Sequence, residues 1–241
     1  MDLRQLKKEV YDANIELVDR GLVIYTWGNV SAVDREKNLV VIKPKGIEYS
    51  DLTEDDMSVV TLDGQHLEGL LPSVDLEIHL EIYKNFPQVG GIAHTHSTWA
   101  TAWCQAGVGI PVFGTTHADH FYGEIPCTRQ MTEAEVEQDY ERNVGKVICS
   151  LFKGRDLLEM GAVLTPGHGP FTWGKDAAGA VEHSVILEEL AKMAKLSLDI
   201  RLAMEQAGGK QEQLPGYMLK KHYTRKYGAD SYFYQEKPPK G

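Results

Sequence analysis

The chain has few cysteines, and they lack the spacings that support cysteine chemistry. Its 241 residues include three, Cys104, Cys127 and Cys149. Because their number is odd, they are widely separated and no Cys-x-x-Cys pair occurs, they form neither a disulfide framework nor a thiolate zinc motif. We interpret them as reduced, buried thiols without a chemical role.

Long apolar runs and an excess of positive charge are also absent. No run approaches the roughly 18 apolar residues of a membrane span, and the first residues lack the apolar core of a secretory signal. The formal net charge is -10, from 25 Lys and Arg against 35 Asp and Glu, whereas a general nucleic-acid binder usually carries a basic surface. We therefore expect neither a membrane nor a nucleic acid as partner, and the cytoplasm is the simplest location.

The composition that remains is that of a globular protein, with 42% hydrophobic and 25% charged residues. The length suits one domain spanning residues 1–241. Helical spacing of apolar residues, helped by cap signals, predicts helices over 3–20, 75–86, 97–106, 132–149 and 176–206. Strand-like runs lie at 22–26, 39–43, 57–62, 89–95 and 162–165. Asp63-Gly64 follows the third of these runs and predicts a hairpin with antiparallel pairing.

The most distinctive feature is a His-Thr-His sequence at the end of the run at 89–95. In a β-strand, side chains at positions i and i+2 point to the same side, so His94 and His96 can reach one ion. The alternative is that both rings only pack and form hydrogen bonds inside the core. A catalytic zinc site usually has three protein ligands and an open position. The candidates for further ligands are Asp75, His79, His117, Asp119 and His168.

Six short motifs in one order resemble those of the class II aldolase and epimerase family, over nearly the whole chain. They are Thr-Trp-Gly-Asn-Val-Ser at 26–31, Ile-Lys-Pro at 42–44, His-Thr-His-Ser at 94–97, Gly-Thr-Thr-His-Ala-Asp at 114–119, Ile-Pro-Cys-Thr-Arg at 125–129 and His-Gly-Pro-Phe at 168–171. The resemblance implies an α/β fold with three layers, in which helices flank a central, mostly antiparallel sheet. It also implies homotetramers with active sites between neighbouring subunits, reached by the C-terminal tail from about residue 227.

By the same resemblance, the metal ligands are His94, His96 and His168, and Asp75 matches the acidic position that completes or adjoins the site. The implied cofactor is Zn²⁺, and Mn²⁺ or Co²⁺ would also suit these ligands. The implied activity is that of an isomerase of pentose metabolism, which inverts C4 of a ketose such as L-ribulose 5-phosphate. Because the C4 hydrogen is not acidic, inversion requires breaking and remaking the C3–C4 bond, and a Lewis acid favours this cleavage.

Two proton-transfer groups are expected, one on each side of C4. Asp119 matches one of the family's acid/base residues. The other is a tyrosine near the C-terminus, where a gapless alignment places Phe233, which has no proton to give. A shift of one residue lets Tyr234 or Tyr232 serve, and we assign the role to Tyr234. The alternative is that these rings only seal a subunit contact.

Substrate binding is where the chain departs from the family. Asn29, Lys43, Gly46 and Ser73 match phosphate-binding positions, but Lys45 and Val74 each replace a serine. The remaining substrate-side candidates are Thr115, Thr116, His222 and Arg225. Lys45 can supply a positive charge for a phosphate, whereas Val74 cannot donate a hydrogen bond. An unphosphorylated ketose therefore stays open as substrate, and so do an aldolase and a metal-bearing binding protein without activity as alternative functions.

Overall fold

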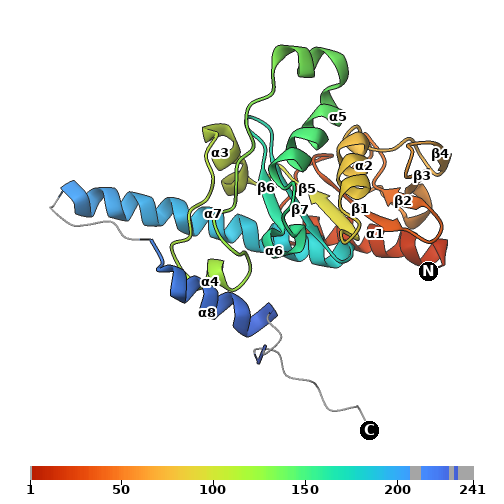
Figure 1. The fold of residues 1–241 in the computed structure, drawn as a ribbon. Coiled ribbons are helices and arrows are strands. Elements are labelled where there is room, and N and C mark those ends of the chain that lie inside the picture. Colours follow the sequence, from red (N-terminus) through yellow and green to blue (C-terminus); the bar gives the residue numbers. More distant parts are fainter. Residues whose placement is uncertain (1, 207–212, 228–230, 233–241) are drawn as a thin grey trace, which may run out of the picture.

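The computed structural model describes residues 2–206, 213–227 and 231–232, and its centre is an antiparallel sheet. Figure 1 shows the yellow strand β5 next to β6 and β7, which come from the second half of the chain. The spatial order of the seven strands is β4-β3-β2-β1-β5-β7-β6, and every pair is antiparallel. Their bounds are Asn29–Asp34 (β1), Leu39–Ile42 (β2), Ser58–Thr61 (β3), His66–Glu68 (β4), Gly91–His94 (β5), Ala162–Leu164 (β6) and Pro170–Gly174 (β7).

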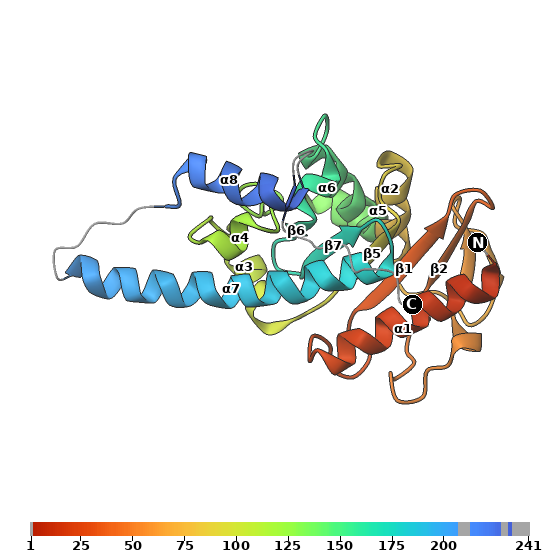
Figure 2. The same cartoon turned by 90° about the horizontal axis from the view of Figure 1, so that it is seen from below.

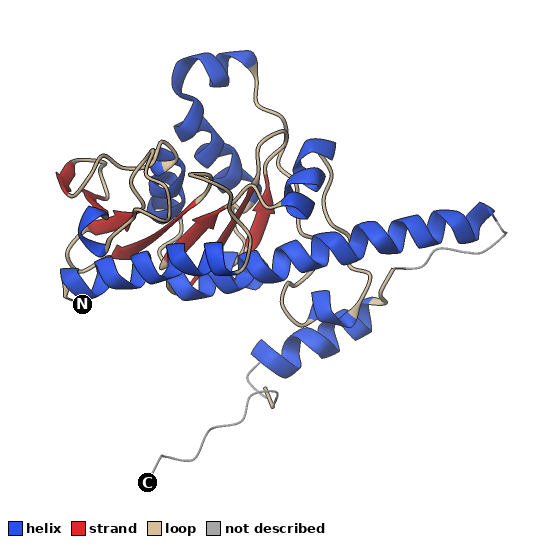
Figure 3. Ribbon diagram, turned by 180° about the vertical axis from the view of Figure 1, so that it is seen from behind, coloured by secondary structure: helices blue, strands red, loops and turns tan. Residues whose placement is uncertain are grey.

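Helices cover both faces of this sheet. The described helices are α1 (Leu3–Asp19), α2 (Leu76–Asn85), α3 (Thr98–Ala106), α4 (Thr115–Ala118), α5 (Glu133–Leu151), α6 (Leu157–Met160), α7 (Ala177–Gln206) and α8 (Gly216–Tyr227), with a 3-10 turn η1 (Glu54–Asp56). α1 and α7 pack on one face and α2 with α5 on the other, which Figures 1 and 3 show from opposite sides. The three-layer arrangement expected from the sequence is confirmed.

Strand alternation explains why both faces need cover. In β2, Val40 and Ile42 pack into the cluster beneath α2 and α5, whereas Val41 packs into the cluster beneath α1 and α7. Successive side chains of a strand point to opposite faces, so an unbroken apolar run becomes a strand buried on both sides. All three residues are fully buried.

Most of the predicted elements are present, and two local predictions are wrong. Residues 22–26 form no strand, because the chain turns at Tyr25, whose φ is 54°, and leaves the side chains of Ile24 and Tyr25 exposed. Ser97 stands at the N-cap position of α3, but its side chain makes no cap hydrogen bond. By contrast, Thr132 and Glu135 form the predicted capping box of α5.

The sheet gathers the candidate residues at one end of its central strands. Asn29 at the start of β1 and Phe171 of β7 both pair with His94, the last residue of β5. His168 lies in the turn just before β7. In antiparallel neighbours, the end of one strand meets the start of the next, so residues far apart in sequence meet here.

α7 continues past the sheet alongside α3, α4 and α8, and its C-terminal end projects beyond the body of the protein in Figure 2. In the part of the chain that the structure describes, no helix combines the length and the apolar character needed to cross a membrane.

Candidate active site

Three histidines from two separate segments meet at this end of the sheet. Possible ligand atoms of His94, His96 and His168 all lie within 4.8 Å of one another. The Nε2 atoms of His94 and His96 are 3.1 Å apart, and the ring of His168 lies 4.7 Å from that of His94 and 5.3 Å from that of His96, centre to centre. The structure thus brings together the three histidines that were predicted from the sequence as metal ligands.

His94 is held in the orientation and protonation state that a metal ligand requires. Its Nδ1 lies 2.9 Å from the carbonyl oxygen of Pro170, and since a carbonyl only accepts, Nδ1 carries the proton and Nε2 presents its lone pair. The ring stacks on Phe171 at 4.2 Å. Burial lowers the pKa of His94 to about 3, so the ring stays neutral at physiological pH.

The rest of the donor set also fits a divalent cation. Burial lowers the pKa of His96 and of His168, and the Nδ1 atom of His168 is buried without a hydrogen-bond partner among the described residues. Burial of the Asp75 carboxyl favours its neutral form, but nearby histidines, above all His94, outweigh this and lower its pKa. Three neutral imidazoles beside one carboxylate are a donor set that binds divalent transition metals.

Asp75 adjoins the three histidines and is part of a polar network. The side-chain amide of Asn29 donates hydrogen bonds to Oδ2 of Asp75 at 2.7 Å and to Oγ of Ser73 at 3.1 Å. The Oδ1 atom of Asn29 is buried and has no partner within the described residues. Asn29 and Ser73 therefore both bond the Asp75 side chain and orient its carboxylate.

The two lysines near this network have different environments. Lys43 is 1% exposed, and its Nζ donates to the carbonyl oxygen of Ile47 at 2.8 Å and lies 4.6 Å from the ring centre of Tyr49. Burial lowers its pKa to about 8. Lys45 and the following Gly46 lie exposed at the turn after β2. Lys43 thus braces the turn from inside, and Lys45 carries its charge toward solvent.

Val74, the second departure from the family pattern, is 64% exposed directly before Asp75. Its exposure leaves the neighbouring polar network intact, because Ser73 still reaches Asn29.

Asp119 lies in a second cluster that α8 completes. Its Oδ1 accepts from Nδ1 of His222 and Nε of Arg225, both at 3.0 Å, and its Oδ2 accepts from Nη2 of Arg225 at 2.6 Å. Burial favours the neutral carboxyl, but these hydrogen bonds outweigh it and lower the pKa of Asp119. Next to it, Nζ of Lys226 donates to Nε2 of His120 at 3.1 Å. Among the described residues, the side-chain hydrogen bonds and ion pairs of Asp119 are all with α8.

Other sequence candidates lie elsewhere. The Nε2–H of His117 donates to the carbonyl oxygen of Gly123 at 2.8 Å, and His79 bonds the hydroxyl of Ser31 at 2.7 Å, so neither belongs to the histidine group. Thr116 lines a surface pocket against α7, and Thr115 begins α4. Tyr234 lies outside the described residues.

Sequence reasoning missed a small cavity beside His168. Its volume is about 120 Å³, and the ring of Tyr140 lies 6.3 Å from that of His168, centre to centre. Tyr140 follows Asp139, where the backbone of α5 departs from helical geometry. No motif marked this residue, since the capping box predicted the helix but not its kink. The lining residues are Thr128, Arg129, Gln130, Met131, Val136, Tyr140, Val144, Val147, Thr165, Pro166 and His168.

Residues 8–195 match the family described as the class II aldolase and adducin N-terminal domain. The chain belongs to this family. Among curated proteins, it is 48% identical over 235 residues to L-ribulose-5-phosphate 4-epimerase UlaF of Salmonella paratyphi C (strain RKS4594), covering 97% of this chain and 100% of that protein. The same enzyme of Salmonella choleraesuis (strain SC-B67) gives the same identity and coverage.

Solved structures of this class II aldolase family share the fold. An L-fuculose 1-phosphate aldolase is 25% identical with a TM-score of 0.76, over 93% of this chain and 97% of the aldolase. YgbL of Klebsiella pneumoniae, described as a putative aldolase/epimerase/decarboxylase, is 24% identical with a TM-score of 0.69, over 92% of this chain and 99% of that protein. The fold class and the family expected from the motifs are both confirmed.

Proposed function

We propose that this chain is a metal-dependent isomerase of the cytoplasm that inverts C4 of L-ribulose 5-phosphate and so forms D-xylulose 5-phosphate. The observation that carries the proposal is the histidine cluster beside Asp75, in a chain that is similar to curated 4-epimerases over nearly its full length. The reaction breaks the C3–C4 bond and re-forms it on the other face of the aldehyde carbon.

His94, His96 and His168 would hold the cation, with Asp75 beside them, and Zn²⁺ suits these ligands as Mn²⁺ or Co²⁺ also would. When bound, the cation supplies a Lewis acid that stabilises the negative charge left on the three-carbon fragment by C3–C4 cleavage. Asn29 supports this site because its amide fixes the Asp75 carboxylate through a 2.7 Å hydrogen bond.

Asp119 takes one of the two proton-transfer roles at the C4 hydroxyl. A carboxylate with a lowered pKa is ionised at neutral pH, and so it can accept a proton. His222 and Arg225 hold both of its oxygens, which fixes the direction from which a proton can approach. These two residues thereby act as positioning residues for Asp119.

Tyr234 takes the second proton-transfer role, on the opposite side of C4. Tyr232 is the alternative, and its backbone N–H donates to the carbonyl oxygen of Arg225 at 3.0 Å. The backbone at Tyr232 therefore lies next to Arg225, one of the residues that hold Asp119. Replacing each tyrosine by phenylalanine, separately and together, assigns the role: the variant that loses turnover of L-ribulose 5-phosphate identifies the acid.

We further propose that each active site is completed by a neighbouring subunit of a homotetramer. Asp119 bonds α8 of its own chain, whereas Asp75 interacts with the histidines, and so the two halves of the catalytic machinery form separate clusters. Donation of Asp119 and the tail across a subunit contact brings the halves together.

The phosphate of the substrate binds at the end of the sheet, near the turn after β2. Asn29, Lys43, Gly46 and Ser73 surround this place, and Lys45 adds an exposed charge that substitutes for a lost hydroxyl. Val74 offers no hydrogen-bond donor, so the site gives a substrate phosphate fewer donors at this position than a serine would. Thr115 and Thr116 approach the substrate with Asp119 from the neighbouring subunit.

The deciding experiment follows the configuration at C4 by carbon NMR, with the zinc-loaded protein and L-ribulose 5-phosphate. Unphosphorylated ketopentoses and ketohexoses serve as matched substrates. Inversion of the phosphate ester supports the proposal, and inversion confined to free sugars refutes the phosphate assignment.

Trapping of the aldehyde fragment separates the two enzyme classes. C3–C4 cleavage releases glycolaldehyde phosphate, which an epimerase re-adds and an aldolase lets go. Accumulation of this aldehyde without inversion would identify an aldolase. Metal binding without turnover of any ketose would identify a binding protein instead.

A further inference from the structure

The helix α3 begins two residues after His96, so the start of this helix sets where the His96 backbone lies. The first N–H groups of an α-helix have no partner within the helix and need an acceptor from elsewhere. Ser97 is at the N-cap position but makes no side-chain cap bond; its hydroxyl instead accepts from Thr95 at 3.2 Å. The donors at the start of α3 must therefore find another acceptor.

That acceptor comes from the long helix α7, 88 or 89 residues away in sequence. The carboxylate of Glu188 accepts from the backbone N–H of Trp99 at 2.8 Å through Oε1 and from that of Ala100 at 2.9 Å through Oε2. A negative charge at a helix N-terminus is also favoured by the helix dipole. Glu188 therefore takes the place that Ser97 leaves vacant, and it ties α3 to α7.

Of the three histidines, His96 has the weakest side-chain support of its own. His94 is fully enclosed and bonds the carbonyl oxygen of Pro170. Within the described residues, the side chain of His96 hydrogen-bonds to Nε2 of His94, which is itself a proposed ligand atom. Its other neighbours are rings, with Trp27 at 6.1 Å and His168 at 5.3 Å, centre to centre. The position of His96 thus depends on the backbone that leads into α3.

We propose that Glu188 is a positioning residue for the metal site, because its carboxylate caps α3 and thereby holds His96 in place to bind the cation. The inference rests on the proposed function, since it requires that the histidines bind a metal. It assigns a role to a residue of the long helix that is not one of the proposed metal ligands.

The mechanism is a loss of order at the first turn of α3. Without the carboxylate, two backbone N–H groups lose their partner, and the turn frays to find water. His96 then occupies a wider range of positions, so the ion must order this ligand when it binds. Loss of an outer residue that orients a ligand typically lowers metal affinity by about 10–100-fold.

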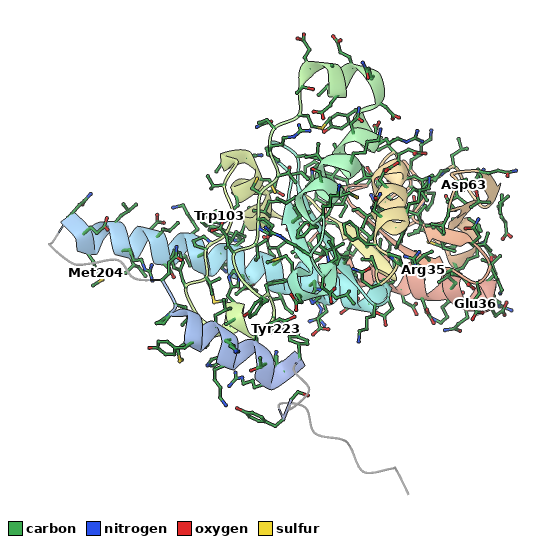
Figure 4. The ribbon with its side chains drawn as sticks, viewed as in Figure 1. Arg35, Glu36, Asp63, Trp103, Met204 and Tyr223 are labelled. Carbon is green, nitrogen blue, oxygen red and sulfur yellow. The ribbon has the colours of Figure 1, made fainter. Side chains whose placement is uncertain are left out.

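The test compares Zn²⁺ affinity of the full chain, measured by competition with a coloured chelator, in the wild-type protein and in Glu188→Ala and Glu188→Gln. Two matched control variants are used. Glu189→Ala removes an exposed carboxylate from the next position of α7. Trp103→Phe removes a third hydrogen bond between α3 and α7, in which Nε1 of Trp103 donates to the carbonyl oxygen of Ala191 at 3.0 Å; Figure 4 labels Trp103 on α3.

We expect Glu188→Ala to weaken Zn²⁺ binding by about 10–100-fold and to alter the absorption spectrum of the Co²⁺-loaded protein. Glu188→Gln should change the affinity in the same direction by less, because its amide oxygen still accepts from one N–H. Trp103→Phe and Glu189→Ala should keep wild-type affinity, although Trp103→Phe lowers the melting temperature.

Two results overturn the inference while the metal site stands. One is wild-type Zn²⁺ affinity, within about twofold, in both Glu188 variants. The other is an equal loss of affinity in Trp103→Phe, which would show that any weakening of the contact between α3 and α7 lowers Zn²⁺ affinity, whether or not the cap is lost. If the wild-type protein itself binds no Zn²⁺, Mn²⁺ or Co²⁺, the proposed metal centre fails, and the role of Glu188 fails with it.

Discussion

Burial sets the protonation of the histidines, and this decides what each can do. A buried imidazole resists taking up a proton because the charged form loses its hydration. The effect keeps His94 neutral and available as a ligand. The same physics acts on His117, which is 3% exposed and forms no part of the histidine cluster.

His117 should make stability depend on pH. Burial lowers its pKa from 6.5 to about 4 in the folded protein, against the opposing effect of its hydrogen bond to Gly123. Between pH 6.5 and about pH 4, His117 binds a proton in the unfolded chain but stays neutral in the folded protein. The contribution of the neutral ring to the free energy of unfolding is therefore complete above pH 6.5 and is lost as the pH falls toward 4. We expect His117→Gln to reduce the change of the unfolding free energy with pH, between pH 4 and 6.5, by up to about 1.4 kcal/mol per pH unit. Urea unfolding at several pH values measures the slope, and an unchanged slope would contradict the prediction.

His96→Asn should remove metal binding with little effect on the fold. His96 is partly exposed and lies outside the packed core, so its loss leaves no large cavity. We expect loss of Zn²⁺ from the purified protein, measured by elemental analysis, and loss of turnover. His66→Asn, on the exposed strand β4, is the control that should retain both. Retention of stoichiometric Zn²⁺ by His96→Asn would count against the assignment.

At the scale of the elements, helix ends carry much of the local information. In α5 the capping box can be predicted from the local sequence. The Thr132 side chain accepts from the Glu135 N–H at 3.3 Å, and the Glu135 side chain accepts from the Thr132 N–H at 2.8 Å. In α3 the cap comes from Glu188 of another helix, and no local sequence pattern predicts this contact. Both ends satisfy the same donors by different routes.

Thr132→Ala should destabilise the protein by about 1 kcal/mol, the usual cost of losing an N-cap side chain. The loss is local, because Glu135 keeps its ion pair with Arg129 at 2.6 Å. Chemical denaturation measures the difference, and Thr132→Ser, which retains the hydroxyl, should match the wild-type protein. Equal stability of the alanine and wild-type proteins would show that the box contributes nothing.

At the scale of the whole molecule, the apolar surface of the C-terminal half of α7 needs explanation. It exposes apolar side chains at several turns, and Figure 4 labels Met204 near its end. The exposed set is Met193, Leu196, Ile200, Leu202 and Met204. A long apolar surface on a projecting helix is typical of a subunit contact, and it supports the proposed tetramer.

Mixing two inactive variants tests whether subunits share active sites. Asp119→Asn and His96→Asn should each lack activity alone. Suppose that each active site combines the histidines of one subunit with Asp119 of its neighbour. A site is then intact only where an Asp119→Asn subunit supplies the histidines and a His96→Asn subunit supplies Asp119. Random assembly should then recover about a quarter of wild-type activity. Co-expression with two different affinity tags isolates the hybrids, and hybrids without activity would place Asp119 and the histidines of one chain in the same site.

The sequence by itself determined the elements with strong periodicity, the family and the histidines of the proposed metal site. Apolar spacing predicted α1, α2 and α7, and the capping box predicted α5, because these signals depend on neighbours along the chain. The His-Thr-His motif indicated two ligands for the same reason. Six motifs in one order indicated the family, which the comparisons confirm.

Only the tertiary structure decided the contacts between distant segments. It showed that residues 22–26 turn away from the sheet, that Lys43 is buried within its turn, and that Arg225 holds Asp119 from 106 residues away. It also paired Glu188 with the start of α3. Such contacts depend on how the layers pack, and packing joins residues that no local pattern relates.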